Sequence, residues 1–299
     1  MADISFNRAR FLQVCHDICS EGHPRFNIGT YKEKKLHLIL KNYFEPLTAC
    51  QEVPHGGYVA DIRNGEGIME IQTSGFASMN GKLEAFLPAS AVTVIYPIAE
   101  RKWVTWIDPV SGDIQPRHRS PKKGMPADVL PEMVFIRDYL NHPHLTVRVV
   151  LLEIEEYRML DGKRSRSRKR GSTRYERMPL DIYRVYDFAC AEDYIRVLPF
   201  ETGTHITSAD LSQKCGFRGR RLSAAIRVLE TVGAIVRDGK QGRAYLYRIC
   251  DIHEDYYKYA VIEEVEPGLY SSTESKSFWY RWTTKGYRRI QKPSQLNQV

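Results

Sequence analysis

Hydrophobic and polar positions along this chain recur with periods that predict both helices and strands. A helical stripe is clearest between residues 31 and 45, where the apolar side chains are three and four residues apart. This stripe consists of Leu36, Ile39, Leu40, Tyr43 and Phe44. The other expected elements are helices at 5–20, 76–87 and 127–141, a hairpin with strands at 57–63 and 67–73, and strands at 91–98, 102–107 and 145–160.

Because strands and helices alternate, we predict a mixed α/β (α+β) fold, with a mixed sheet flanked by helices. A second, compact pattern of two helices and a hairpin follows it. The tail is rich in Tyr and Trp and has no assignable role. We therefore divide the chain into an N-terminal helix (1–24), a core domain (25–160), a basic arm and linker (161–199), a small domain (200–250) and the tail (251–299).

Composition narrows the class of protein. The 299 residues carry a net charge of +8, with a pI near 9.1, and this balance favours a polyanionic partner such as DNA. No run of about 18 apolar residues occurs, so we expect no membrane span. The start, MADISFNRAR, contains no apolar leader with a cleavage site, so we expect a cytoplasmic protein.

The six cysteines include no CxxC pair, and the chain is too long for a small disulfide scaffold. Cys15, His16, Cys19 and His23 form the densest group of metal-ligating residue types. Thiols four residues apart on a helix are more simply explained as small buried side chains, and we expect no zinc site.

The stretch 57–73 reads GYVADIRNGEGIMEIQT, and Asn64-Gly65 within it predicts a two-residue turn. That turn places Asp61 opposite Ile68 and makes Asp61 and Glu70 diagonal neighbours across the two strands. Side chains alternate between the faces of a strand. One face then holds Asp61, Glu70 and Gln72, and the other holds Tyr58, Ala60, Ile62, Met69 and Ile71, which we expect to pack against a helix.

Two carboxylates directed at one place repel each other unless a divalent cation lies between them. The alternative is that both are solvated acids on an exposed sheet face. Glu33 extends the buried stripe of the helix at 31–45 toward its start, which would bring a third carboxylate near the pair. Thr30 and Glu33 also match the T-x-x-E pattern of a capping box, and both interpretations stay open.

Glu33 on a helix, Asp61 on a strand and Glu70-Ile71-Gln72 on the next strand together resemble the PD-(D/E)xK (restriction-endonuclease-like) nuclease superfamily, over about residues 30–98. The superfamily includes restriction enzymes and Holliday-junction resolvases. Two positions depart from its pattern, because Ala60 replaces the proline and Gln72 replaces the lysine. Some active members also carry glutamine at the lysine position.

The resemblance implies a role for each matched residue. Asp61, Glu70 and the Ile71 carbonyl would bind Mg²⁺ (or Mn²⁺), Glu33 would hold a second ion or a water, and Gln72 would orient the attacking water. Glutamine supplies no positive charge and takes no proton at neutral pH. Lys82, on the helix after the second strand, is a candidate replacement for the missing cation, although a solvated helix lysine is the simpler interpretation.

The small domain resembles the winged helix-turn-helix family over most of 203–250. Thr207 or Ser208 begins its first helix, Gly216 ends it, a second helix covers about 218–231 and a hairpin with a Gly-rich tip follows. The resemblance implies that the second helix and the hairpin contact DNA, the alternative being a protein-binding module. The candidate DNA-binding residues are Arg218, Arg220, Arg221, Arg227, Lys240 and Arg243.

A basic run, KRSRSRKRGSTRYER, occupies residues 163–177 and holds eight basic residues against one acid. It shows no apolar periodicity, so we expect a loop or a disordered arm. The arm either clamps DNA or is merely a solvated loop. Its candidate DNA-binding residues are Lys163, Arg164, Arg166, Arg168, Lys169 and Arg170.

These features predict a Mg²⁺-dependent DNA endonuclease of a restriction or defence type. A homodimer is a candidate assembly, and the sequence does not determine the oligomeric state. The main alternative is a non-enzymatic DNA-binding regulator with an inactive nuclease-like core, and Gln72 is the residue that supports it. A Holliday-junction resolvase is a third interpretation.

Overall fold

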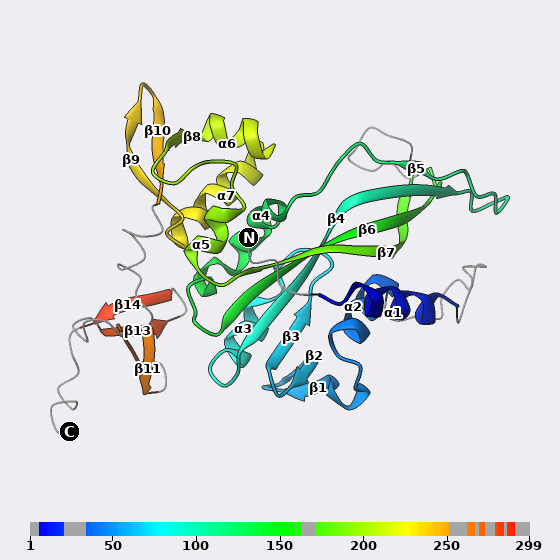
Figure 1. Ribbon diagram of the computed structural model, residues 1–299, viewed down its shortest axis with the longest axis horizontal. Coiled ribbons are helices and arrows are strands. Elements are labelled where there is room, and N and C mark those ends of the chain that lie inside the picture. Colours follow the sequence, from blue (N-terminus) through cyan, green and yellow to red (C-terminus); the bar gives the residue numbers. More distant parts are fainter. Residues whose placement is uncertain are drawn as a thin grey trace.

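The computed structural model describes residues 6–20, 34–162 and 171–250 in full, and four strands between 262 and 290 as backbone alone (Figure 1). Glu33 and residues 163–170 lie outside the described residues, and so does the proposed cap at Thr30. No helix in the described part of the chain is long and apolar enough to cross a membrane.

A mixed sheet of seven strands forms the centre of the protein, as the alternating pattern predicted. The strand order is β1-β2-β3-β4-β6-β7, with β5 paired to β4. β3, β4 and β6 are mutually parallel, while the other neighbours are antiparallel. The strands are β1 (Gln51–His55), β2 (Tyr58–Asn64), β3 (Gly67–Ile71), β4 (Val92–Ile107), β5 (His118–Arg119), β6 (Leu145–Met159) and β7 (Thr173–Phe188).

Helices cover both faces of this sheet. Successive side chains of a strand therefore enter different hydrophobic cores. Ile68 belongs to one hydrophobic cluster and its neighbour Met69 to the other. The Met69 cluster contains α1 (Arg8–Ser20) and α2 (Lys35–Phe44), whose predicted stripe is buried. The Ile68 cluster contains α3 (Asn80–Phe86), η2 (Pro126–Val129), α4 (Leu130–Met133) and η3 (Val134–Tyr139).

The hairpin of β2 and β3 has a register two residues away from the predicted one. Asn64 pairs with Gly67, so the turn consists of Gly65 and Glu66. Asn64 stays at the end of its strand because its side-chain oxygen accepts the Glu66 N–H at 2.9 Å, while its amide nitrogen donates to Glu45 at 2.9 Å. A shift of two preserves the faces, and it brings Asp61 opposite Glu70 instead of diagonal to it.

The predicted apolar face of the hairpin is only partly correct. Ile62, Met69 and Ile71 are buried against α2, as expected. Ala60 is buried in the opposite cluster, and Tyr58 is 43% exposed. The last pair in the register is Ile62 with Met69, so β2 leaves its ladder with β3 before Ala60.

Three further elements differ from the sequence prediction. The strands expected at 91–98 and 102–107 form the single strand β4, whose register shifts between Ala99 and Arg101. The helix expected at 127–141 is divided into η2, α4 and η3, and Ile136 has non-helical angles. Within the expected arm and linker, 173–188 forms β7, because Met178, Ile182, Val185 and Phe188 are buried.

The small domain has the predicted order of elements. Asp210 donates its N–H to the Thr207 hydroxyl at 3.3 Å, which caps the first helix, and Gly216 ends it with φ +73°. Its three-stranded sheet has the order β8-β10-β9. Its elements are β8 (His205–Thr207), α6 (Ser208–Cys215), α7 (Arg220–Thr231), β9 (Ile235–Gln241) and β10 (Ala244–Ile249), and the helix α5 (Ala191–Arg196) precedes them in the segment predicted as a linker.

Helix α7 lies against α4, so the small domain shares a hydrophobic cluster with the main sheet. At one end of α7, Arg221 approaches Asp128 at 3.6 Å, and at the other the Asn141 side chain donates to the Thr231 carbonyl at 2.9 Å. Part of the surface of α7 is therefore covered by the core domain.

The tail, to which the sequence analysis assigned no elements, contributes a separate antiparallel sheet. Its order is β11-β12-β13-β14. The strands are β11 (Ile262–Glu266), β12 (Leu269–Ser272), β13 (Trp279–Thr283) and β14 (Gly286–Ile290).

The tight turn between β2 and β3 gives a first testable prediction. Gly67 has φ +124°, and a Cβ there would lie 2.4 Å from the Ala91 carbonyl oxygen. We expect Gly67→Ala to lower the free energy of unfolding by about 2 kcal/mol or more, measured by urea denaturation. Gly65→Ala is the matched control, since nothing lies within 4 Å of its Cβ position. Equal stability of both variants would contradict the observed register.

Candidate active site

Asp61 and Glu70 face each other where the ladder of β2 and β3 ends. The Asp61 N–H donates to Glu70 Oε1 at 3.3 Å, and the Ile71 N–H donates to Asp61 Oδ2 at 2.7 Å. Each carboxylate thus accepts a hydrogen bond from the backbone of the opposite strand. The two acids predicted on one face are therefore held together by the fold itself.

Glu70 is fully buried, and its charged partner is Lys82 on α3. The Lys82 ammonium lies 2.7 Å from Glu70 Oε2 and donates to the Val59 carbonyl at 2.8 Å. The interpretation of Lys82 as a solvated helix lysine is therefore wrong. The alternative of two solvated acids is also wrong, because no part of Glu70 is exposed.

Gly81, next to Lys82, permits a close approach between α3 and β2. A Cβ at Gly81 would lie 2.4 Å from the Tyr58 hydroxyl oxygen. A larger residue would displace Tyr58 or push α3 away from the sheet. Because Lys82 reaches Glu70 from this helix, the glycine contributes to the geometry of the ion pair.

The two carboxylates differ in acidity. Burial, followed by the negative charge of Asp61, raises the pKa of Glu70 to about 7, against the opposing effect of Lys82. Burial acts in the same direction on Asp61, but hydrogen bonds from His37 and from the Ile71 N–H outweigh it and lower the Asp61 pKa. Near neutral pH, Asp61 is ionised and Glu70 is close to its titration midpoint.

Helix α2 supplies a further group that the sequence analysis missed. His37 Nε2 lies 3.2 Å from Asp61 Oδ2, and one turn later Lys41 is buried and pairs with Glu52 at 2.7 Å. Glu52 has φ +51°, a conformation uncommon for residues other than glycine. The sequence signal that could have identified His37 was its position next to Leu36 in the buried stripe of α2, because this helix packs against β3.

The other predicted site residues have varied surroundings. Gln72 is partly buried, and its backbone N–H donates to the Ile95 carbonyl at 2.9 Å. The Ile71 side chain is buried, so only its backbone can take part in chemistry. Within the described residues, no group of three or more His, Cys, Asp or Glu side chains could hold a metal ion.

Residues expected on the N-terminal helix are described only in part. Cys15 is buried and Cys19 is half-buried, as the structural interpretation of these thiols predicted. Burial raises the pKa of Cys15 to about 12, so its thiol is neutral at physiological pH. His23 lies outside the described residues.

The candidate DNA-binding residues of the small domain are all exposed. Within the described residues, Arg221 is the one among them that has a charged partner in the core domain, Asp128. The basic residues at 163–170 lie outside the described residues, between the ends of β6 and β7. The exposed residues are Arg218, Arg220, Arg221, Arg227, Lys240 and Arg243.

Comparison with known proteins places the chain in a family without an assigned function. The model of the domain of unknown function DUF8091 matches residues 34–189, slightly more than half of the 299 residues. The chain belongs to the DUF8091 family. An uncharacterized protein of Treponema pallidum (strain Nichols) is 30% identical over 222 residues, which is 74% of this chain and 87% of that protein. No solved structure matches the chain.

The DUF8091 match begins just before α2 and ends just after β7. It therefore contains the whole main sheet together with His37, Asp61, Glu70 and Lys82. The small domain and the tail lie beyond it. The candidate site thus belongs to the part of the chain that defines the family.

The raised pKa of Glu70 predicts how stability depends on pH. An unfolded glutamate releases its proton near pH 4.5, whereas folded Glu70 releases it near 7, so between these values the folded state binds more protons. Stability should therefore fall as pH rises through this window, by roughly 3 kcal/mol from Glu70 alone. We expect Glu70→Gln to flatten the fall, measured by urea denaturation in EDTA from pH 5 to 8.

Glu84→Gln is the control, because Glu84 is an exposed acid on α3, the helix that carries Lys82. This variant should retain the slope of the parent protein. If Glu70→Gln retained the full slope as well, Glu70 would not be the group that titrates.

Proposed function

We propose that this DUF8091 protein is a divalent-metal-dependent endonuclease that hydrolyses phosphodiester bonds in DNA. The observation that carries the proposal is the convergence of Asp61, Glu70 and Lys82 at the end of one strand ladder. Two acids and a lysine are the residue types of the PD-(D/E)xK pattern. The lysine comes from α3 and not from the position of Gln72.

The residues present fit Mg²⁺ or Mn²⁺. Mg²⁺ is commonly held by one or two carboxylates and retains several waters, so a third acidic side chain is not required. Both hydrogen bonds that the Asp61 carboxylate makes with described residues use Oδ2, and Oδ1 is then the atom suited to a cation. Glu70 and the Ile71 carbonyl would complete the protein ligands. The bound ion would lower the pKa of a water and neutralise charge on the phosphate.

The side chains around the acids have separate roles in this proposal. Lys82 provides the fixed positive charge that Gln72 lacks, within 2.7 Å of Glu70. His37 positions Asp61 through its contact with Oδ2. Gln72 follows Glu70 by two residues, and its amide is suited to orienting a water by hydrogen bonding but not to taking its proton.

DNA as the substrate is supported by charge and by the small domain. The chain has a net charge of +8. Six basic side chains are exposed in the segment just before α7, on α7 itself and on the hairpin β9–β10. The order of α6, α7 and this hairpin supports a winged helix-turn-helix domain. The basic residues between β6 and β7 would add phosphate contacts from the core domain.

A non-enzymatic DNA-binding regulator is the second candidate function. The observation that favours it is the ion pair between Lys82 and Glu70, which partly neutralises the site without a cation. In that case Asp61 and Glu70 would be structural, and the small domain would carry the activity. Assays of cleavage and binding separate the two functions.

The endonuclease proposal predicts the effect of removing each acid. We expect Asp61→Asn and Glu70→Gln each to reduce Mg²⁺- or Mn²⁺-dependent nicking of plasmid DNA by more than about 100-fold, because each removes a charged ligand from a two-carboxylate site. Lys82→Ala should also reduce the rate, and Lys82→Arg should restore part of it. Gel shifts in Ca²⁺ should show unchanged DNA binding by all four variants.

Glu84→Gln, which removes an exposed acid from α3, serves as the control. Urea denaturation verifies that each variant is folded. Nicking by Asp61→Asn at the rate of the parent would remove Asp61 from the proposed site. A parent protein that binds DNA but cleaves no linear, supercoiled or branched substrate would favour the regulator.

The small domain gives a separate prediction about binding. Arg220 and Arg227 are exposed and seven residues apart, so they lie on the same side of α7. If both contact phosphates, Arg220→Ala/Arg227→Ala should reduce the log–log salt slope of DNA binding by about 1.8. Arg137→Ala, an exposed arginine on η3, should leave the slope unchanged. A slope unchanged in the double variant would make protein binding the better explanation of this domain.

A further inference from the structure

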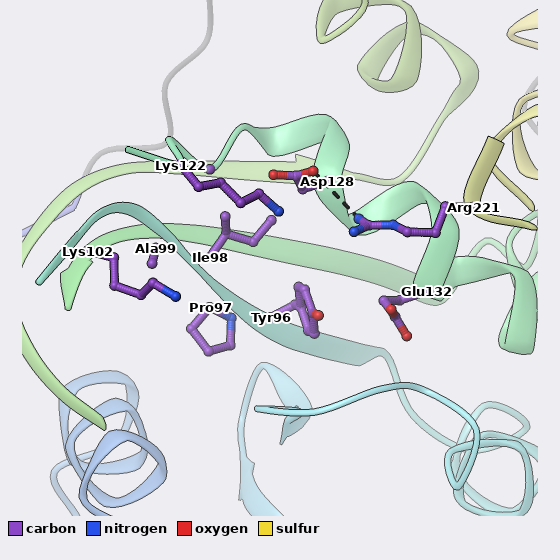
Figure 2. A pocket seen from close by; sticks show the side chains of 10 residues that line it. Tyr96, Pro97, Ile98, Ala99, Lys102, Lys122, Asp128, Glu132 and Arg221 are labelled. Atoms are coloured by element: carbon purple, nitrogen blue, oxygen red, sulfur yellow. Dashed lines mark ion pairs between the residues drawn. The ribbon is translucent and has the colours of Figure 1, made fainter. Parts of the chain in front are cut away.

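A cavity of about 250 Å³ lies between β4, the loop that precedes η2, and helices α4 and α7. Figure 2 shows the side chains that surround it. They come from the core domain with one exception, Arg221, which enters from α7 of the small domain. The polar groups are Tyr96, Lys102, Lys122, Asp128, Glu132 and Arg221.

The loop at this cavity approaches β4 very closely. Gly124 donates its N–H to the Ala99 carbonyl at 3.0 Å, and a Cβ on Gly124 would lie 2.4 Å from the same oxygen. Only glycine permits this contact without a shift of the backbone. The contact fixes the loop and thereby places Lys122 beside the strand that carries Lys102.

The cavity adjoins the candidate active site through the pairing of β3 with β4. Glu70 pairs with Val94, and the Gln72 N–H donates to the Ile95 carbonyl. Tyr96 is two residues beyond Val94, so it lies roughly 7 Å further along the sheet on the same face as Glu70. A Cβ on Gly75 would lie 2.9 Å from Glu132 Oε2, so the segment after Gln72 also lies close to Glu132, one of the residues that line the cavity.

Charged groups surround much of the cavity. Figure 2 shows Lys102 at one end, Arg221 and Glu132 toward the other, the Lys122 side chain extending toward Asp128, and the Tyr96 ring between Lys102 and Glu132. Arg221 is only 3.6 Å from Asp128, and its side chain is 51% exposed, so its donors are not saturated by this pair. Lys102 also approaches Glu156 at 3.8 Å.

We propose that this cavity binds one nucleotide, with its phosphate at Lys102 and Lys122 and its base at Tyr96, Asp128 and Glu132. This inference rests on the proposed function in taking the nucleotide to be part of the DNA strand next to the site of cleavage. Lysines suit a phosphate, whereas the acids would repel it. The acids instead suit the amino and imino N–H groups of a base.

The Tyr96 ring is suited to stack on such a base. Its edge-to-face contact with Phe76, with ring centroids 5.1 Å apart, fixes the ring from one side. Burial raises the pKa of Tyr96, so its hydroxyl stays protonated and can donate a hydrogen bond. A stacked base tolerates changes of sequence, because every base has an aromatic face.

The experiment measures binding of deoxynucleoside monophosphates to the full chain by saturation-transfer NMR in EDTA, where no cleavage occurs. Deoxynucleosides and inorganic phosphate are the companion probes. We expect Tyr96→Leu to weaken monophosphate and nucleoside binding by about fivefold or more, and Tyr96→Phe to retain it. Lys102→Gln should weaken monophosphate binding and leave nucleoside binding unchanged.

Lys123→Gln is the control, because Lys123 is next to Lys122 in the loop, is 71% exposed and pairs with Glu100. A parent protein that binds no monophosphate at millimolar concentration would overturn the proposal. Equal affinity of the parent, Lys102→Gln and Tyr96→Leu would also overturn it. Asp61→Asn should retain monophosphate binding, so the pocket and the proposed cleavage can fail independently.

A second arm distinguishes a free nucleotide from one within DNA. Single-stranded oligonucleotides in Ca²⁺ are compared with the same strands carrying one abasic site, for the parent and for Tyr96→Leu. If the pocket holds a base of the DNA strand, the abasic site should weaken binding to the parent about fivefold and have no effect on Tyr96→Leu. Equal affinity of both strands for the parent would show that any nucleotide bound there is not part of DNA.

Discussion

Glu70 brings a carboxylate into the interior of the face of the sheet that α3 covers, where none of its side chain is exposed. A charge without a partner would be very unfavourable there. Lys82 approaches from α3, Asp61 donates its N–H from β2, and the Glu70 pKa rises to about 7. The end of the β2–β3 ladder, the position of α3 and its close approach to β2 at Gly81 together satisfy this buried group.

Much of the fold was predictable because local chemistry determines its elements. The apolar stripe of α2, the Thr207 cap and the Gly216 end of α6 lie where the sequence placed them. The hairpin register was not predictable from Asn64-Gly65, because the Asn64 side chain prefers contacts to Glu66 and Glu45 over a place in the turn. Such contacts depend on tertiary structure. β7 was not predicted because its first residues belong to the basic run at 163–177, which shows no apolar periodicity.

The candidate site was predicted better than the register on which the argument rested. A shift of two residues leaves the paired side chains of the ladder on their faces, so Asp61 and Glu70 still lie together. Lys82 was a candidate only through the family resemblance, and His37 was missed, because these residues come from α3 and α2 and reach the acids only when both helices have docked. A side chain that arrives from a third element leaves little periodic signal in the sequence.

The segment from η2 to η3 connects these parts of the molecule. It forms a wall of the core domain, it carries Asp128 and Glu132 into the cavity, and α7 lies against it. Domains joined by a flexible linker usually move relative to each other unless their interface is large and apolar. Here the cluster that includes Leu130 also includes Leu229 of α7, so the interface is part of a hydrophobic core. The exposed arginines of α7 are thus held at a fixed position relative to Glu70.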